Sequence, residues 1–167
     1  PMTLIGGRYR GVIPGQVAGT VVQFYVEGED VLGATSTFPA AGAESRALYR
    51  VNTGQGAGFA IDRIQLIMLP GDVSNSSSDA NLMGNQFYGA SLTVNGQEAF
   101  YDVAARRKGG VFHGRTRGYR VNFRPDQLFR GVHDRIALDG TGSDNLLRGS
   151  QDEILANQLI SHAGGIV

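Results

Sequence analysis

The sequence predicts an α+β protein that is mainly β: a truncated β-sandwich, followed by an antiparallel sheet and one main helix. Short segments rich in β-branched and aromatic residues recur at close spacing along most of the 167 residues. Glycine, with 25 residues, takes about twice its usual share, which favours turns and short strands over long helices. Only residues 151–162 combine an apolar helical repeat with both a start and a stop signal.

The composition excludes several classes of protein. Hydrophobic residues make up 41% of the chain, which is enough for a packed core and excludes a disordered chain. The absence of cysteine excludes disulfides and thiolate metal sites. No apolar run reaches the roughly 18 residues that a membrane-spanning helix needs. The chain begins at Pro1 without a signal peptide, so we expect it to be a piece of a longer polypeptide.

Residues 1–52 are predicted to form short strands at 9–13, 20–27, 34–38 and 47–51. The first is expected to end at the turn pair Pro14-Gly15. The second, TVVQFYVE, is the richest in β-branched and aromatic residues. Such spacing is typical of a β-sandwich, and only about half of one is present, so we expect further strands upstream.

Residues 53–58 (TGQGAG) are predicted to be a linker between a first domain, 1–52, and a second, 59–167. Residues 61–69 are expected to be a buried strand that ends at Pro70-Gly71, before a polar loop over 74–79. Ser77 or Ser78 is expected to cap a short helix that extends to about Met83. Residues 87–94 and 98–106 read as strands joined by Asn95-Gly96, the strongest hairpin signal in the chain.

The stretch from residue 103 to 135 contains nine cations and two carboxylates, although the whole chain is formally neutral. Within it, Tyr119, Val121 and Phe123 alternate with polar residues, which predicts a strand with one apolar face and one arginine face. Arginine binds phosphate through parallel hydrogen bonds from its planar guanidinium group, and glycine lets the backbone approach the phosphate closely. The sequence therefore offers a phosphate site with these candidates: Arg106, Lys108, Gly109, Gly110, Gly114, Arg117 and Arg120. The alternative is a solvated strand face with turn glycines.

The C-terminal part is predicted to contain a short strand at 135–138, a helical turn at 144–148 and the main helix at 151–162. Ser150 is its expected cap, Glu153 occupies the capping-box position, and Ala163-Gly164-Gly165 is expected to stop it. His113, His133 and His162 have no ligand spacing, so no metal site is predicted.

The order of these motifs resembles a known family. A strand, the Asn-Gly hairpin, a basic strand running into Lys-Gly, RGYRVNF, FRG, a short apolar strand, LLR and a helix ending in Ala-Gly follow one another over residues 59–167. This order resembles the N-terminal part of the CotH family, spore-coat-type proteins with a kinase-like fold. Residues 1–52, with GTVVQFYVEGED, resemble half of a fibronectin type III-like or immunoglobulin-like module.

The resemblance implies an atypical protein kinase that uses ATP and a divalent metal such as Mg²⁺ to phosphorylate serine or threonine in secreted, surface or spore-coat proteins. It implies that residues 59–167 are the N-lobe, with Arg106, Lys108, Gly109, Gly110, Arg117 and Arg120 facing the nucleotide. Glu153 would orient the phosphate-binding cation, and Asp152 is the second candidate for this role. The alternative is that both carboxylates only stabilise the N-terminus of the helix. Thr116, Arg117 and Gly118 stand where the family commonly has lysine, lysine and serine.

The carboxylates that phosphoryl transfer needs would lie in a C-lobe that the 167 residues do not include, so we expect this fragment to be inert. Its expected partners are a nucleotide, an unknown protein substrate and the rest of the parent chain. A non-catalytic extracellular structural or adhesion module is the alternative function. A nucleic-acid surface ranks last, because the alternation places Tyr119 and Phe123 inside.

Overall fold

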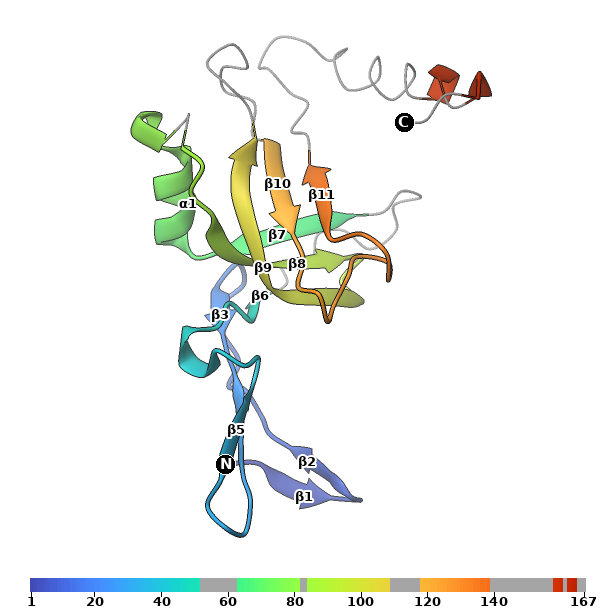
Figure 1. The fold of residues 1–167 in the computed structure, drawn as a ribbon. Coiled ribbons are helices and arrows are strands. Elements are labelled where there is room, and N and C mark those ends of the chain that lie inside the picture. The colour runs from blue at the N-terminus through green and yellow to red at the C-terminus, as the bar shows by residue number, and fades with distance from the viewer. Residues whose placement is uncertain (52–62, 82–83, 109–117, 139–157, 161, 165–167) are drawn as a thin grey trace.

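A five-stranded antiparallel sheet forms the body of the chain, and three two-stranded ribbons precede it in sequence (Figure 1). The computed structural model describes residues 1–51, 63–81, 84–108, 118–138, 158–160 and 162–164. The sheet has the order β11-β10-β9-β8-β7, in which every neighbouring pair is antiparallel. Its strands are β7 (Ile64–Met68), β8 (Tyr88–Val94), β9 (Glu98–Lys108), β10 (Gly118–Asn122) and β11 (Arg135–Leu138). The predicted mainly β, α+β class is therefore confirmed.

The hairpin between β8 and β9 forms where the sequence places it. Asn95 and Gly96 both have positive φ angles, of 55° and 68°, as a tight hairpin turn requires. The strand predicted over 98–106 continues to Lys108, and the strands predicted over 87–94 and 135–138 correspond to β8 and β11. The central strand pairs thus follow the alternation and turn signals of the sequence.

The strand β9 bends at Asp102, where the chain carries a β-bulge. Ala90 pairs with Val103 and Leu92 with Phe100, so β9 has one residue more than β8 over this interval. Asp102 has a φ of 53°, in the left-handed region that aspartate tolerates. Figure 1 shows the consequence: β9 curves, and β7 runs across the direction of β10 and β11.

The core lies on the inner face of this curved sheet. Phe100, Phe123 and Phe129 form a cluster with ring centroids 5.1 to 5.5 Å apart. Val121 and Leu92 are fully buried beside it, and each buried aliphatic side chain of this size contributes about 1.5–3 kcal/mol to stability. Tyr119 packs against this core, as the alternation predicts.

The helix α1 (Pro70–Ser77) occupies a segment that the sequence analysis assigned to a turn and a polar loop. A short 3-10 helix, η2 (Asp79–Asn81), lies within the segment where the sequence predicts a short helix from Ser77 or Ser78 to about Met83. Ser78 directly before it is extended, as a residue that caps a helix is, and residues 82–83 lie outside the described residues. Pro70 stands at the first turn of α1, where its fixed φ is favourable and its missing N–H costs nothing.

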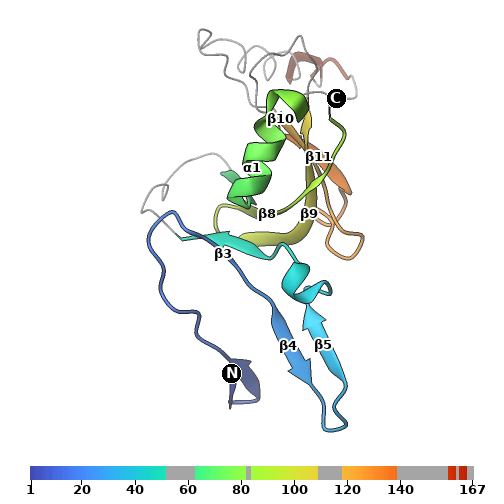
Figure 2. The ribbon, with the colours of Figure 1, turned by 90° about the vertical axis from the view of Figure 1, so that its left-hand side faces the viewer.

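Residues 1–51 form three two-stranded ribbons. They are β1 (Thr3–Ile5) with β2 (Arg8–Arg10), β3 (Val21–Gln23) with β6 (Leu48–Arg50), and β4 (Val26–Glu29) with β5 (Thr35–Phe38). The single strand predicted over 20–27 is wrong: it divides, because β3 pairs with β6 whereas β4 pairs with β5. The β1–β2 and β4–β5 ribbons extend away from the five-stranded sheet in both views (Figures 1 and 2).

The end of this N-terminal segment packs on the sheet. A 3-10 helix, η1 (Gly42–Glu44), is followed by residues 45–48, of which Ala47 and Leu48 are fully buried. Ser91 on β8 accepts a hydrogen bond from the Leu48 N–H at 2.8 Å. This hydrogen bond joins the segments before and after the predicted linker at 53–58. The linker itself lies outside the described residues.

The main predicted helix, 151–162, is described only at its end. Residues 158–160 and 162 are helical, the Ala163 N–H donates to the carbonyl of Leu159, and Gly164 has a φ of 81°. The helix therefore ends at the predicted stop signal. Within the described residues, no helix is both long enough and apolar enough to cross a membrane.

Candidate functional site

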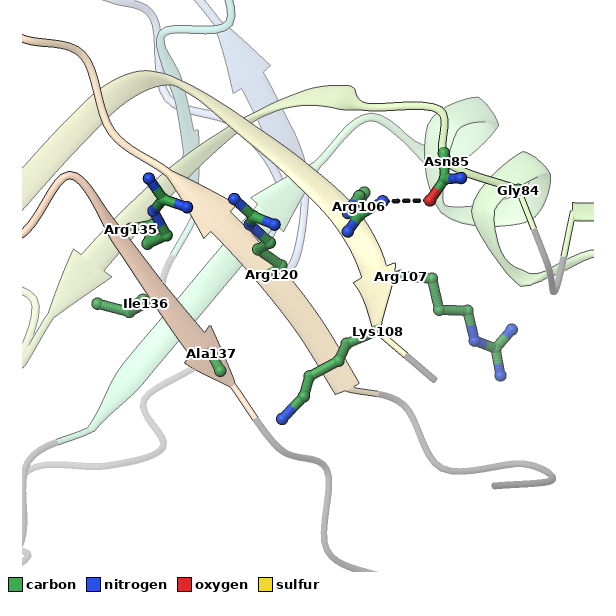
Figure 3. Close-up of a pocket in the computed structure, with 9 residues that line it drawn as sticks. All are labelled: Gly84, Asn85, Arg106, Arg107, Lys108, Arg120, Arg135, Ile136 and Ala137. Carbon is green, nitrogen blue, oxygen red and sulfur yellow. Dashed lines mark hydrogen bonds between the residues drawn. The ribbon is translucent and has the colours of Figure 1, made fainter. Parts of the chain in front are cut away.

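The register of β9, β10 and β11 gathers basic side chains on the outer face of the sheet. Arg106 on β9 pairs directly with Arg120 on β10. Lys108 lies two residues beyond Arg106 and so shares its face. On β11, Arg135 shares the face of Ala137, the partner of Arg120. Figure 3 shows Arg106, Arg120 and Arg135 in a row across the three strands, with Lys108 nearby.

A cavity of about 580 Å³ lies over this face, and we call it the basic cleft. Its volume falls in the range of small-molecule sites. It is lined by Gly84, Asn85, Arg106, Arg107, Lys108, Arg120, Arg135, Ile136 and Ala137. These described lining residues include five cations and no carboxylate, so the cleft attracts anions.

A second cavity of about 380 Å³ adjoins the basic cleft and shares Arg120 and Arg135 with it. Its other lining residues are Asn122, Phe123, Pro125, Leu128 and Asp134. This second cavity is less basic than the first, because Asp134 contributes a carboxylate. We call the two cavities together the groove, because the two residues that they share lie on β10 and β11.

The arginine residues of the basic cleft have different partners. Arg106 donates from Nη1 to the Asn85 amide oxygen, and its guanidinium carbon lies 5.5 Å from the centre of the Phe87 ring. Arg120 donates from Nε to the Asn122 amide oxygen at 3.2 Å. The Nε of Arg106 is buried without a hydrogen-bond partner in the described part of the chain.

The third arginine of the row has a carboxylate partner. Arg135 donates from Nη2 to Asp134 at 2.9 Å, and both side chains are mostly exposed. The hydrogen bond from Arg135, together with its charge, holds the pKa of the Asp134 carboxyl below its ordinary value and raises the pKa of Arg135. The positive charge of Arg120 acts on Asp134 in the same direction. Arg135 is thus largely compensated by its neighbour.

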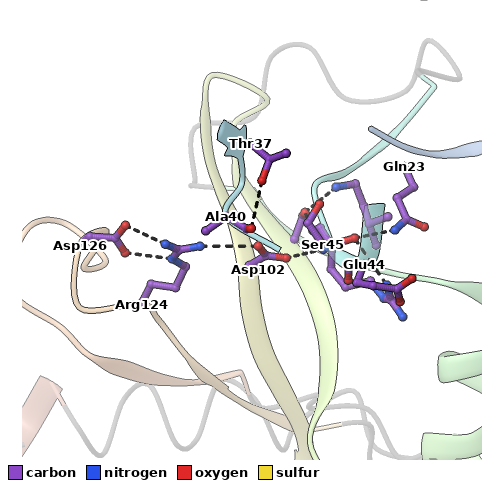
Figure 4. A network of polar contacts seen from close by, with 11 residues as sticks. Gln23, Thr37, Ala40, Glu44, Ser45, Asp102, Arg124 and Asp126 are labelled. Carbon is purple, nitrogen blue, oxygen red and sulfur yellow. Dashed lines mark hydrogen bonds and ion pairs between the residues drawn. The ribbon is translucent and has the colours of Figure 1, made fainter. Parts of the chain in front are cut away.

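Arg124 leaves the basic face, although the alternation of the sequence placed it beside Arg120. Because β10 ends at Asn122, Arg124 turns toward Asp126, to which it donates two hydrogen bonds of 2.9 Å. Its Nη1 also lies 3.6 Å from Asp102 (Figure 4). The bond from Arg124 lowers the pKa of Asp126, and the same bond raises the pKa of Arg124. Arg107 also projects away from the row of Figure 3, since it lies on the opposite face of β9.

Directly opposed like charges on neighbouring strands are unfavourable. Arg106 and Arg120 nevertheless form such a pair, and Lys108 adds a third cation to the same face. A bound anion would relieve this repulsion, and a guanidinium fork fits the oxygens of phosphate or carboxylate. The cluster of Arg106, Arg120 and Lys108 can therefore bind and orient an anion. The described residues contain no group of three His, Cys, Asp or Glu side chains that could hold a metal.

Three of the predicted site residues, Arg106, Lys108 and Arg120, lie together in the basic cleft. Gly109, Gly110, Gly114, Arg117, Asp152 and Glu153 lie outside the described residues. The sequence analysis did not identify Asn85 or Asn122 as site residues. The alternation did place Asn122 on the arginine face, whereas no local pattern indicates Asn85.

Comparisons with protein-family models, with curated proteins and with solved structures find no match to this chain. The functional argument therefore depends on the geometry of the basic cleft and on the ordered motifs of the sequence.

Proposed function

We propose that this chain carries the phosphate-binding lobe of a CotH-type, kinase-like protein, with the basic cleft facing the phosphates of ATP. The observation that carries the proposal is the cluster of Arg106, Lys108 and Arg120 on one sheet face above a cavity of about 580 Å³. Phosphoryl transfer depends on positioning and on neutralising the phosphate oxygens, which is what such a cluster supplies. The five-stranded antiparallel sheet with a helix is compatible with an N-lobe.

In this proposal ATP supplies the phosphoryl group for serine or threonine residues of secreted, surface or spore-coat proteins. Arg106 on β9 and Arg120 on β10 bind phosphate oxygens, and Lys108 adds a cation at the C-terminal end of β9. In this proposal the Mg²⁺ ligands and the catalytic carboxylates belong to the C-lobe that the family resemblance implies. Glu153 remains the proposed orienting carboxylate, and Gly109, Gly110 and Arg117 are the proposed phosphate contacts in the segment that follows β9 in sequence.

The test is a calorimetric titration of the 167-residue chain with ATP, with inorganic triphosphate and with adenosine, each with and without Mg²⁺. We expect ATP and triphosphate to bind with a Kd below about 1 mM, which corresponds to about 4 kcal/mol, and adenosine to give no signal. Arg120→Ala should weaken ATP binding roughly tenfold, because it removes charge-assisted hydrogen bonds. Arg10→Ala is the matched control, since it removes one exposed arginine from the distant β2. A flat ATP titration of the folded chain contradicts the proposal.

A non-catalytic extracellular structural or adhesion module is the second candidate. The ribbons over residues 1–38 favour it, because they extend from the sheet and expose apolar side chains such as Leu4, Tyr9 and Phe38. It predicts no response to ATP or to triphosphate. A nucleic-acid surface would instead bind single-stranded oligonucleotides, with an affinity that falls steeply as salt rises.

A further inference from the structure

Four arginine residues on or directly after strands β9 to β11, namely Arg106, Arg120, Arg124 and Arg135, fall into two sets according to their hydrogen-bond partners. Arg124 and Arg135 donate to the carboxylates of Asp126 and Asp134, at 2.9 Å in both pairs. Arg106 and Arg120 donate instead to the side-chain amides of Asn85 and Asn122. Of these two sets, only Arg106 and Arg120 are partners on neighbouring strands, and both line the basic cleft.

The two kinds of partner have different electrostatic consequences. A guanidinium has only donors, so an asparagine beside it must turn its amide oxygen toward it. The amide fixes the orientation of the guanidinium but leaves its positive charge in place. A carboxylate fixes the orientation equally well and cancels the charge at the same time. Amide partners are therefore suited to cations that must stay available to an anion.

We propose that Arg106 and Arg120 form a preset receptor for phosphate groups, in which Asn85 and Asn122 are positioning residues that orient the two guanidinium groups without neutralising them. This inference rests on the proposed function of the same cleft and adds to it the residues that determine its charge. The receptor is suited to phosphate groups because guanidinium groups from two neighbouring strands can each donate to the oxygens of one group.

Phe87 completes the support of Arg106. Its ring lies 5.5 Å from the guanidinium carbon, within the range of a favourable cation–π contact. The ring and the Asn85 amide fix the guanidinium in two directions, and the buried Nε has no hydrogen-bond partner among the described residues. Neither Asn85 nor Phe87 neutralises the cation, in keeping with the amide partner of Arg120.

The experiment compares Asn85→Asp with Asn85→Ala, and Asn122→Asp with Asn122→Ala, in the 167-residue chain. Aspartate has nearly the shape of asparagine and keeps an oxygen toward the arginine, but it adds a negative charge. We expect each aspartate variant to weaken the binding of inorganic triphosphate roughly tenfold or more, while its thermal unfolding midpoint is unchanged or higher. Each alanine variant should weaken binding less, by roughly threefold, through lost orientation alone.

Gln97→Glu is the matched control, because it adds the same charge at the exposed β8–β9 turn, at the opposite end of β9 from the cleft. It should leave triphosphate binding within about twofold of the unaltered chain, since distant surface charges are screened. If the unaltered chain does not bind triphosphate, both the function and this inference fail. If it binds, and Arg106→Ala and Arg120→Ala weaken binding while the aspartate variants do not, only the positioning role is overturned. Asn85 is exposed and lies outside the strands, so its aspartate variant decides the question should Asn122→Asp fail to fold.

Discussion

The carboxylate of Asp102 accepts a hydrogen bond from the backbone N–H of Arg46, which lies 56 residues earlier in the chain (Figure 4). The Arg46 backbone is also bound through its carbonyl, which accepts a bond from Ser91 Oγ. Asp102 sits in the bulge of β9, and its second oxygen faces Arg124. One bulged residue thus connects the N-terminal segment, the centre of the sheet and the turn after β10.

Replacing Asp102 with alanine should destabilise the fold by about 1–3 kcal/mol, because the half-buried N–H of Arg46 loses its acceptor and Arg124 loses one of its anions. Asp102→Asn should cost less, since an amide oxygen can still accept the bond and asparagine tolerates the positive φ. Urea unfolding followed by far-UV circular dichroism measures both. Equal losses for the two variants would show that charge, and not the hydrogen bond to Arg46, is what Asp102 contributes.

Ser91 makes the second connection, and its removal should also be costly. Its hydroxyl is fully buried, accepts from the Leu48 N–H at 2.8 Å and donates to the Arg46 carbonyl. Ser91→Ala removes the acceptor of the Leu48 N–H and leaves the Arg46 carbonyl with only the long bond from the Asp102 N–H, at 3.5 Å. We therefore expect a loss of about 1–3 kcal/mol in the same urea measurement. Thr93→Ala, on the same face of β8 but only half-buried, is the control and should cost clearly less.

Gly89 lies under the same segment, and we expect that any side chain there would lift the segment from the sheet. A Cβ at Gly89 would lie 2.4 Å from Cγ of Arg46 and 3.3 Å from its Cβ, atoms that the bound Arg46 backbone cannot move far. Gly89→Ala should therefore raise the hydrogen-exchange rate of the Leu48 amide about tenfold, equivalent to about 1.4 kcal/mol. Gly28→Ala on β4 meets no atom within 4 Å and should leave that rate unchanged.

The parts of the fold that could be predicted depend on local signals. Asn95-Gly96 predicted the β8–β9 hairpin because few other pairs tolerate two positive φ angles. The alternation around Val121 predicted both faces of β10, and hence that Arg120 lies outside and Phe123 inside. The register that pairs Arg106 with Arg120 was not predicted from the sequence, because several registers would bring these two basic segments together.

The remaining features depend on tertiary contacts or on ambiguous signals. Pro70-Gly71 is as compatible with a turn as with the first turn of a helix, so α1 was missed. The bulge at Asp102 shifts the inward face of β9 by one residue, and no pattern in the sequence indicates it. Asn85 reaches Arg106 only because the chain returns from α1 along the edge of the cleft. Its role could not be read from spacing.

The ion pair between Asp134 and Arg135 should be visible in a pH titration. The hydrogen bond from Arg135 lowers the folded-state pKa of Asp134, so its stabilising contribution is complete above the ordinary aspartate pKa of 3.8. That contribution is lost as the pH falls through the lower, folded-state value. Carbon-detected NMR of the Asp134 carboxyl should show a midpoint below 3.8, and Arg135→Ala should return it toward that value. An unchanged midpoint in the variant would show that Arg135 does not form the pair in solution.

Asp134 should also limit how strongly the groove binds anions. It pairs with Arg135 and faces Arg120, and both arginines are shared by the two cavities. Asp134→Asn keeps a hydrogen-bond acceptor for Arg135 but removes the competing charge, so triphosphate binding at neutral pH should tighten roughly two- to fivefold. Asp126→Asn removes the same charge beside Arg124, outside the cleft, and should change binding by clearly less. If the two variants tighten binding equally, the effect comes from net charge, and Asp134 has no specific influence on the basic cleft.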